Sequence, residues 1–341
     1  MKFDTIYPDA KTNEIFQSEF YLRKNSKISG CARCGSMTRW FDLVFGSYLC
    51  SEKCCSNIVE SFKKDQIAAG NNVDFDKMFK KIKEELKLAL LFEDEWKDII
   101  VVVKDELSYF KQCIESIQKY TKKYHLYIWD NGSNQETQNY IENLIASLEL
   151  KEDSDVKITT CRSEENTGFI FPNNELIALG ESPYVILLNS DTRVLEYWDK
   201  VLVGFLKSNH DVSQVGYWGG FIDEDGTGFG GGNGFEVDYI PGWCFCIDRK
   251  TYEKHGLFND ELKFAYCEDS DFSLRLKQSG NKIYSLYSSL VRHYQNKTVI
   301  SVEKENSVNL RETFDYNHEY FRKKWKDYLE NDRVSLKGIS L

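Results

Sequence analysis

The sequence predicts an α/β protein with a mainly parallel sheet, preceded by a small cysteine-rich module. From about residue 98 onward, apolar β-branched runs alternate with stretches of helical periodicity, which is the pattern of βαβ units. Several of these runs end abruptly in polar residues, as in "YVILLNSDT" at 184–192. Half of the ten cysteines crowd between residues 31 and 55. The alternation predicts the fold class, and the other two observations indicate where function is concentrated.

Length and charge limit the possible functions. A chain of 341 residues favours two domains, or one large domain with additions. The net charge of −10 argues against a nucleic-acid partner, which would normally meet a basic face. No apolar run approaches the roughly 18 to 20 residues that span a bilayer, so we expect no transmembrane segment. The first residues also lack the apolar stretch of a signal peptide, and we therefore expect a cytoplasmic protein.

The N-terminal module, residues 1–92, contains two close pairs of cysteines. Cys31 and Cys34 form the first pair, and Cys50 and Cys54 form the second. This spacing predicts a four-thiolate zinc site, and "YLCSEKC" resembles the second knuckle of treble-clef zinc fingers. Cys55 is an alternative fourth ligand, and buried free thiols are the alternative to a metal site. A closed site of this kind serves folding or docking rather than chemistry.

The predicted elements follow in order along the chain. Apolar residues at helical spacing predict a helix over 74–92 that links the module to the next domain. The predicted strands and helices are 98–103 (strand), 107–120 (helix), 125–130 (strand), a helix beyond residue 133, and 156–161 (strand). Asn131-Gly132 is a hairpin signal, but Ser133 and Glu136 form a capping box before a helical stripe. The segment is therefore predicted as strand, turn and helix.

Two later regions have a distinctive composition. Ten of the 21 glycines fall between Gly216 and Gly242, which predicts a flexible surface loop that can act as a lid. Residues 320–329 place Phe321, Trp325, Tyr328 and Leu329 on one helical stripe, which predicts packing against the rest of the protein.

Four polar motifs occur in a recognisable order. They are "IWDNGSNQET" (128–137), "ENTGFIFPNN" (165–174), "LLNSDT" (187–192) and "FAYCEDSDFSLRLKQSG" (264–280). This ordered set resembles family-2 glycosyltransferases over about residues 97–300. The resemblance implies the GT-A fold, an α/β nucleotide-diphosphosugar-binding domain, followed here by a helical extension at 301–341. It also implies inverting transfer of a sugar, usually with Mn²⁺ or Mg²⁺.

The resemblance assigns a donor side to the site. Asp130, at the end of a predicted strand, matches the aspartate that pairs with a uracil or thymine edge, although local turn hydrogen bonding is an equal alternative. The other donor-side matches are Val102 and Lys104 after the first strand, Asn166 and Gly168 beside the nucleotide, and Asn189 near the ribose or a metal-bound water. Asn189 stands where the family's metal-binding Asp-x-Asp motif has its first aspartate.

The resemblance also assigns the metal and the chemistry. Asp191 matches the metal-binding aspartate, and His293 matches a histidine that often completes the metal site, with a half-buried structural imidazole as the alternative. Asp269 matches the catalytic base, and Glu268 beside it is expected to orient the acceptor. Trp243 is a candidate stacking platform for an acceptor sugar, although it is also a plausible core residue. Close carboxylates raise each other's pKa, which strengthens a base.

These expectations combine into one function. The chain is expected to transfer a sugar from a UDP- or dTDP-linked donor to a hydroxyl of a glycan, lipid-linked or protein acceptor. Cysteine spacing adds structural Zn²⁺ to the expected cofactors. An alternative is a catalytically silent GT-A-like binding module in which the zinc finger is the working part. A nucleotidyltransferase is a third option, but "VVVKDELS" lacks the glycine-rich, lysine-containing signature of that class.

Overall fold

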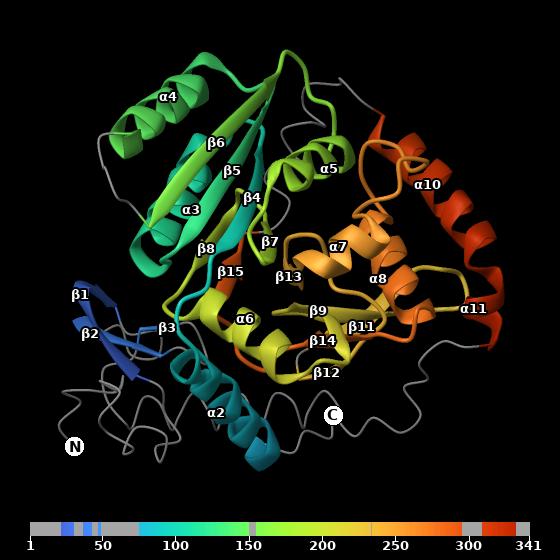
Figure 1. Cartoon of the computed structure of the whole chain (residues 1–341), viewed down its shortest axis with the longest axis horizontal. Helices are drawn as coiled ribbons and strands as arrows, with labels where there is room; N and C mark the ends of the chain where they lie inside the picture. Colours follow the sequence, from blue (N-terminus) through green and yellow to red (C-terminus); the bar gives the residue numbers. More distant parts are fainter. Residues whose placement is uncertain are drawn as a thin grey trace.

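The computed structural model describes residues 22–30, 37–42, 47–48, 75–149, 155–232, 234–294 and 309–331 (Figure 1). The helices are α2 (Phe75–Leu91), α3 (Leu107–Tyr120), α4 (Gln135–Glu149), α5 (Ile170–Leu179), α6 (Trp198–Ser208), α7 (Arg249–His255), α8 (Glu268–Gln278), α10 (Leu310–Lys324) and α11 (Lys326–Asn331). The strands of the main sheet are β4 (Lys97–Val103), β5 (Tyr124–Asn131), β6 (Val156–Ser163), β7 (Tyr184–Leu188), β9 (Val212–Gly216), β12 (Phe235–Glu236), β13 (Cys244–Asp248) and β14 (Lys282–Ser285). The smaller sheets are formed by β1 (Leu22–Gly30), β2 (Met37–Asp42) and β3 (Ser47–Tyr48), by β8 (Thr192–Val194) with β15 (Val291–His293), and by β10 (Gly219–Ile222) with β11 (Gly228–Gly232).

The main sheet has eight strands in the order β12-β14-β9-β13-β7-β4-β5-β6. The four strands β7, β4, β5 and β6 pair in parallel, as the βαβ pattern predicts. The strand β13 runs antiparallel to both of its neighbours, β7 and β9. The expected α/β fold with a mainly parallel sheet is confirmed, and the reversed β13 departs from the parallel pairing.

Helices cover both faces of this sheet (Figure 1). Side chains of α2, α3, α4 and α6 pack with alternate strand residues such as Val101, Ile128 and Ile186 in one core. The intervening residues, such as Ile100 and Leu187, pack with α5 and α8 in a second core. Strands buried on both faces read as continuous apolar runs, which is why "IIVVV" and "YVILL" show no alternation.

Two buried ion pairs anchor the start of β4. The ammonium of Lys97 lies 2.6 Å from a carboxylate oxygen of Asp199 on α6. The carboxylate of Asp98 pairs with the guanidinium of Arg249 on α7. Lys97, Asp98 and Asp199 are each only 1% exposed, and a buried charge of this kind persists only with its partner in place. These pairs tie the central strand to one helix on each side of the sheet.

The glycine-rich region forms strands, and the prediction of a flexible surface loop was wrong. β10 and β11 pair antiparallel across a turn. A Cβ on Gly220 would lie 2.5 Å from the ring of Tyr239, and a Cβ on Gly219 would lie 2.6 Å from Val237. The glycines are therefore needed for close packing of the hairpin on the following segment rather than for mobility.

Two helix caps also differ from the predictions. The side chain of Asn134, not Ser133, caps α4 by accepting a hydrogen bond of 3.1 Å from the backbone of Thr137. The Ser133 hydroxyl instead accepts a hydrogen bond from the backbone of Asp105. Thr192 stands just before "VLEYWDKVLVGFL" (194–206), a pattern that predicts a helix with Thr192 as its cap, but Thr192 begins β8 and α6 starts at Trp198.

The last two helices pack against α8 (Figure 1). Phe321, Trp325 and Leu329 are buried with Leu274 of α8 and Ile222 of β10, so the predicted packing stripe is confirmed. Within the described part of the chain, no helix is both long and apolar enough to cross a bilayer. The predicted zinc ligands Cys31, Cys34, Cys50 and Cys54, and the alternative Cys55, lie outside the described residues.

Candidate active site

A pocket of about 320 Å³ opens where the carboxyl ends of β4 and β5 meet the start of α8. Nine of the predicted site residues line it: Val102, Lys104, Asn166, Gly168, Asn189, Trp243, Glu268, Asp269 and His293. These residues come from segments that are distant in the sequence, so the fold brings together most of the predicted site. Asp130 and Asp191 lie behind this lining, and each is 4% exposed.

Asn131 organises the part of the pocket that Asn166 and Gly168 line, whereas its sequence pattern predicted only a turn. Its side-chain amide donates hydrogen bonds of 2.8 Å to the side-chain oxygen of Asn166 and to the carbonyl of Gly168. Its side-chain oxygen accepts hydrogen bonds from the backbone and the hydroxyl of Thr167 and from the hydroxyl of Ser163. Asn131 therefore fixes the shape of the loop 166–168. The only signal for it was its place directly after Asp130 at the end of a strand.

Asp130 makes two local interactions. One carboxylate oxygen accepts a hydrogen bond of 2.9 Å from the backbone of Ser133. The other pairs with the guanidinium of Arg162 on the neighbouring strand β6. The predicted alternative of turn hydrogen bonding thus describes this geometry, and the carboxylate is aimed at Arg162 rather than into the pocket.

Lys104 is the one lysine or arginine among the described residues that line the pocket. Its ammonium donates hydrogen bonds to the Asp105 carboxylate at 2.8 Å and to the carbonyl of Gly132 at 3.0 Å. Asp105 and Glu106 both have positive φ angles, of 55° and 46°, so the chain turns sharply after β4. This turn places a cation beside the pocket mouth, where an anionic diphosphate group would find it.

Asp191 and His293 meet at the pairing of β8 and β15. Thr192 lies opposite His293 in this antiparallel pair. Nε2 of His293 is 3.1 Å from Oδ1 of Asp191. The geometry is not that of a hydrogen bond, and Nε2 is buried without a hydrogen-bonding partner among the described residues. The imidazole ring also stacks on Trp243, with centroids 5.1 Å apart and planes 11° apart.

An imidazole nitrogen and a carboxylate oxygen that converge in this way suit a divalent cation such as Mn²⁺. Nε2 of His293 fits this use because it is buried and has no hydrogen-bonding partner among the described residues. The described residues contain no group of three or more potential metal-ligating side chains. The pair would therefore supply only part of a coordination shell and leave the remaining positions to a substrate and water.

Trp243 is half-buried in the pocket wall. One face of its indole ring is taken by His293, so the ring has at most its other face for a sugar. Its backbone carbonyl accepts a hydrogen bond from the backbone of Asn189 at 2.9 Å. Trp243 thus also fixes the position of the NSDT turn. Cys244 and Cys246, which follow on β13, are fully buried and belong to the core.

Buried groups of α3 support the NSDT turn from behind. The thiol of Cys113 lies 3.5 Å from the hydroxyl of Thr192 and 3.7 Å from the carbonyl of Asn189. The Thr192 hydroxyl itself donates to the carbonyl of Asn189 at 2.7 Å. The hydroxyl of Ser116 accepts a hydrogen bond from the backbone of Val194. These contacts fix the backbone that presents Asp191.

Glu268 and Asp269 open the first turn of α8 and line the same pocket. Asp269 accepts a hydrogen bond of 3.0 Å from the backbone of Gly242 and one of 2.7 Å from the backbone of Ser270. Oε2 of Glu268 is buried and has no hydrogen-bonding partner among the described residues. Burial, together with the neighbouring Asp269, raises the pKa of Glu268 to about 8. Burial also raises the pKa of Asp269, although its hydrogen bonds counteract this shift.

Asp271, two residues further on, has a structural role. It pairs with Arg275 at 3.1 Å, with Lys324 at 2.6 Å, and accepts a hydrogen bond of 2.9 Å from the indole of Trp325. It is fully buried under the C-terminal helices. The acidic cluster thus divides into Glu268 and Asp269, which face the pocket, and Asp271, which holds α8 in place.

Comparisons with known proteins match the part of the chain that contains the first three motifs. Residues 98–258 match the sequence model of Glycosyl transferase family 2. An uncharacterized glycosyltransferase of Methanocaldococcus jannaschii is 25% identical over 131 residues, which are 38% of this chain and 43% of the relative. The chain thus spans less than half of the length of this curated relative. Glu268, Asp269 and His293 lie beyond the matched range.

Solved structures show a weaker likeness. GalNAc-T7 with UDP, GalNAc and Mn²⁺ aligns with a TM-score of 0.49 and 18% identity, over 59% of this chain and 44% of that one. TarS 1-349 of S. aureus in complex with UDP-GlcNAc aligns with a TM-score of 0.45 and 15% identity, over 71% and 77% of the two chains. A mannosyltransferase from Pyrobaculum calidifontis with GDP-Man and Mn²⁺ aligns with a TM-score of 0.44 and 12% identity, over 61% and 65%. Residues 98–258, which contain most of the parallel strands and part of the pocket lining, are therefore similar to Glycosyl transferase family 2.

Proposed function

We propose that this protein transfers a sugar from a nucleotide-diphosphosugar to an acceptor hydroxyl, with inversion at the anomeric carbon. The observation that carries the proposal is that two unlike groups belong to one pocket. His293, which lies 3.1 Å from Asp191, lines this pocket, and so do Glu268 and Asp269. The first pair suits a metal-bound diphosphate, and the second suits removal of a proton from an acceptor.

Asp269 serves as the general base in this proposal. Inverting transfer needs one base on the face opposite the leaving group, and a carboxylate within about 3 Å of the hydroxyl can accept its proton. The backbone hydrogen bonds from Gly242 and Ser270 hold Asp269 in one orientation. Glu268 holds a proton near neutral pH because of its raised pKa, and it can therefore donate a hydrogen bond to the acceptor.

The donor occupies the side of the pocket lined by Val102, Lys104, Asn166 and Asn189. Lys104 offers its charge to the diphosphate, and the loop held by Asn131 contacts the nucleoside. A divalent cation held by Asp191 and His293 would neutralise the charge that gathers on the leaving diphosphate, and oxygen and imidazole ligands suit Mn²⁺ or Mg²⁺. UDP or dTDP is the nucleotide we propose.

Thermal unfolding in the presence of donors tests the proposal. Panels of UDP-, dTDP- and GDP-sugars, each with and without Mn²⁺, are expected to raise the melting temperature only for the right nucleotide and more strongly with metal. Release of the nucleotide diphosphate then reports transfer. An absence of stabilisation by every donor contradicts the proposal.

A second candidate is a silent binding module on the same fold. Asn189 in place of an aspartate favours it, as does the ion pair between Asp130 and Arg162. Donor stabilisation without any nucleotide release, in the presence of extracts that contain possible acceptors, would support this candidate over the enzyme.

We also propose that Cys31, Cys34, Cys50 and Cys54 bind a structural zinc ion in a module, residues 1–92, that docks a protein or carrier acceptor. The spacing of the two cysteine pairs supports the metal. Metal analysis of the purified protein is expected to give one zinc per chain, and Cys31→Ser is expected to lose it. Deletion of residues 1–92 with unchanged transfer to the natural acceptor contradicts the docking role.

A further inference from the structure

The loop Lys263–Cys267 leads directly into the two pocket carboxylates and has an unusual backbone. Phe264, Tyr266 and Cys267 have φ angles of 57°, 84° and 67°. Residues with a Cβ rarely adopt this left-handed region, and they persist there only where surrounding groups hold them. The loop must therefore be held from outside.

The side chain of Asn317 on α10 holds this loop. Its oxygen accepts a hydrogen bond of 2.8 Å from the backbone of Lys263. Its amide donates to the carbonyls of Lys263 and Ala265, at 2.8 Å each, and to the carbonyl of Tyr266 at 3.1 Å. Asn317 is fully buried. Both ends of one amide are thus used on four backbone groups, which a carboxylate or an apolar side chain cannot reproduce.

The start of α5 holds the same loop from the opposite side. The carbonyl of Phe264 accepts hydrogen bonds from the backbones of Phe169 at 2.6 Å and Ile170 at 3.2 Å. A Cβ on Gly168 would lie 2.5 Å from this carbonyl, so only glycine allows the approach. The loop therefore lies between the donor-side segment 168–170 and the C-terminal helix.

The loop is connected directly to the two carboxylates. The backbone of Tyr266 hydrogen-bonds to Glu268, and Cys267 is the residue from which α8 begins. Tyr266 also lines the pocket together with Leu310 of α10. Because the loop carries no regular secondary structure, its position depends on the groups that hold it.

We propose that Asn317 is a positioning residue that sets Glu268 and Asp269 for transfer by holding the loop Lys263–Tyr266. This makes α10, which lies outside the matched family range, a part of the active site. The part of this proposal that concerns transfer rests on the proposed function. The part that concerns structure, that Asn317 fixes the geometry of the loop, does not depend on it.

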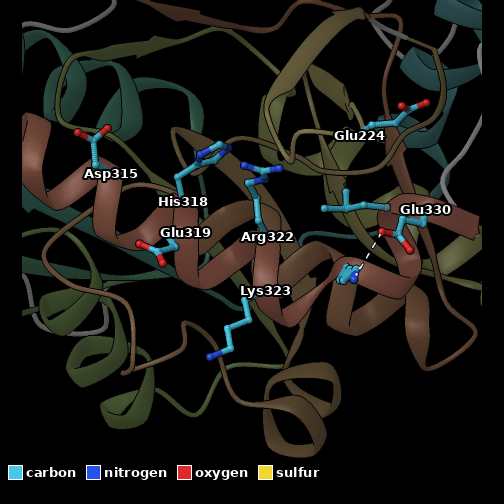
Figure 2. A pocket seen from close by; sticks show the side chains of 9 residues that line it. Glu224, Asp315, His318, Glu319, Arg322, Lys323 and Glu330 are labelled. Carbon is cyan, nitrogen blue, oxygen red and sulfur yellow. Dashed lines mark ion pairs between the residues drawn. The ribbon is translucent and has the colours of Figure 1, made fainter.

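The opposite side of α10 provides a matched control. A charged pocket of about 410 Å³ lies along this helix. Figure 2 shows the side chains that line it, among them Glu319 and Lys323 of α10. Glu319 is exposed and lies two residues from Asn317. The substitution Glu319→Gln therefore changes the same helix without touching the loop.

The test compares Asn317→Leu, Asn317→Ser and Glu319→Gln in the full chain. Hydrogen exchange followed by mass spectrometry is expected to show faster exchange around residue 263 in both Asn317 variants and no change in the control. Nucleotide release is expected to fall about 100-fold in kcat for Asn317→Leu, as for a displaced catalytic group, while the KM for the donor stays within about twofold. The pH profile of kcat is also expected to shift, because the surroundings of Glu268 change.

Three results overturn the proposal. One is a folded Asn317→Leu protein with the kcat and pH profile of the control. A second is equal exchange around residue 263 in all three variants. If Asn317→Leu does not fold, Asn317→Ser and the unmodified protein decide, and rapid exchange of the Lys263 amide in the unmodified protein contradicts the proposal. Failure of the proposed function looks different: the unmodified protein then releases no nucleotide, while exchange still reports whether Asn317 holds the loop.

Discussion

Nε2 of His293 lies 3.1 Å from Oδ1 of Asp191, across the pairing of two short strands. The two residues are far apart in the sequence, and the pairing of β8 with β15 is what makes them neighbours. The imidazole is also fixed by its stacking on Trp243. The pair is therefore a rigid feature of the fold, and its own chemistry suggests the first prediction.

Removing either member of this pair is expected to weaken metal binding. Asp191→Asn and His293→Ala should each lower the affinity for Mn²⁺ by at least about tenfold, since even the outer partners of metal ligands have effects of that size. The measurement is the Mn²⁺-dependent part of the melting-temperature rise with donor. His210→Ala, at an exposed histidine, is the control and should behave like the unmodified protein. Equal Mn²⁺ dependence in all four proteins contradicts the assignment.

Asp269→Asn is expected to separate binding from transfer. Loss of a general base lowers turnover by about 10²- to 10⁴-fold, because the acceptor hydroxyl has no group to take its proton. Donor binding should persist, because Asp269 is not among the residues proposed to contact the donor. Nucleotide release and thermal shift measure the two properties, with the exposed Asp225→Asn as control. An Asp269→Asn protein that retains normal turnover would show that the base is another group.

Stability is expected to fall as the pH rises through the neutral range. The pKa of Glu268 is about 8 in the folded chain, against an ordinary value of 4.5. Between these values the folded chain holds a proton that the unfolded chain has lost, so the free energy of unfolding falls as pH rises from about 4.5 to 8.

Urea unfolding at several pH values checks this prediction. Glu268→Gln has no proton to lose and should show a smaller decline of stability with pH. Some decline should remain, because burial also raises the pKa of Glu85 to about 7. Parallel declines in the two proteins would mean that Glu268 is ionised throughout the range.

Gly168→Ala is expected to disturb the site, and Gly280→Ala is its matched control. Both glycines have left-handed φ angles, +89° and +85°, so both substitutions carry a backbone cost of about 1 kcal/mol. A Cβ at Gly280 meets nothing within 4 Å, whereas one at Gly168 meets the backbone of Phe264. Urea unfolding should show the larger loss for Gly168→Ala, and its turnover should fall as the loop before Glu268 moves. Equal losses would show that the loop yields without cost.

Local patterns predicted the parallel half of the sheet well. The predicted helix at 107–120 agrees with α3, and the strand predicted at 98–103 lies within β4. These segments are buried on both faces or along one stripe, and such burial produces recognisable patterns of apolar residues in the sequence. β8 and β15 were not predicted because each has three residues and is defined only by its partner.

The same holds for the site, where local patterns predicted some residues and residues defined by long-range contacts were missed. Residues at strand ends, such as Asn189, were found because a buried run ends there. Asn131 and Asn317 were not found, because a buried asparagine is recognised only by the backbone groups that it meets. The resemblance assigned Asp130 to the nucleobase of the donor. Its ion pair with Arg162 on the neighbouring strand could be seen only in the folded chain. Long-range hydrogen bonds and ion pairs account for most of these differences.

Asn317 also has a consequence for the order in which the protein matures during synthesis. A ribosome makes the carboxylates of α8 before it makes α10, so the nascent chain first presents Glu268 and Asp269 without the amide that holds their loop. Domains fold as the chain emerges, and the sheet is complete before α10 leaves the ribosome. The growing chain can therefore form its sheet before Asn317 holds the loop that precedes Glu268. Under the proposal, folding of the sheet then comes before completion of the active site.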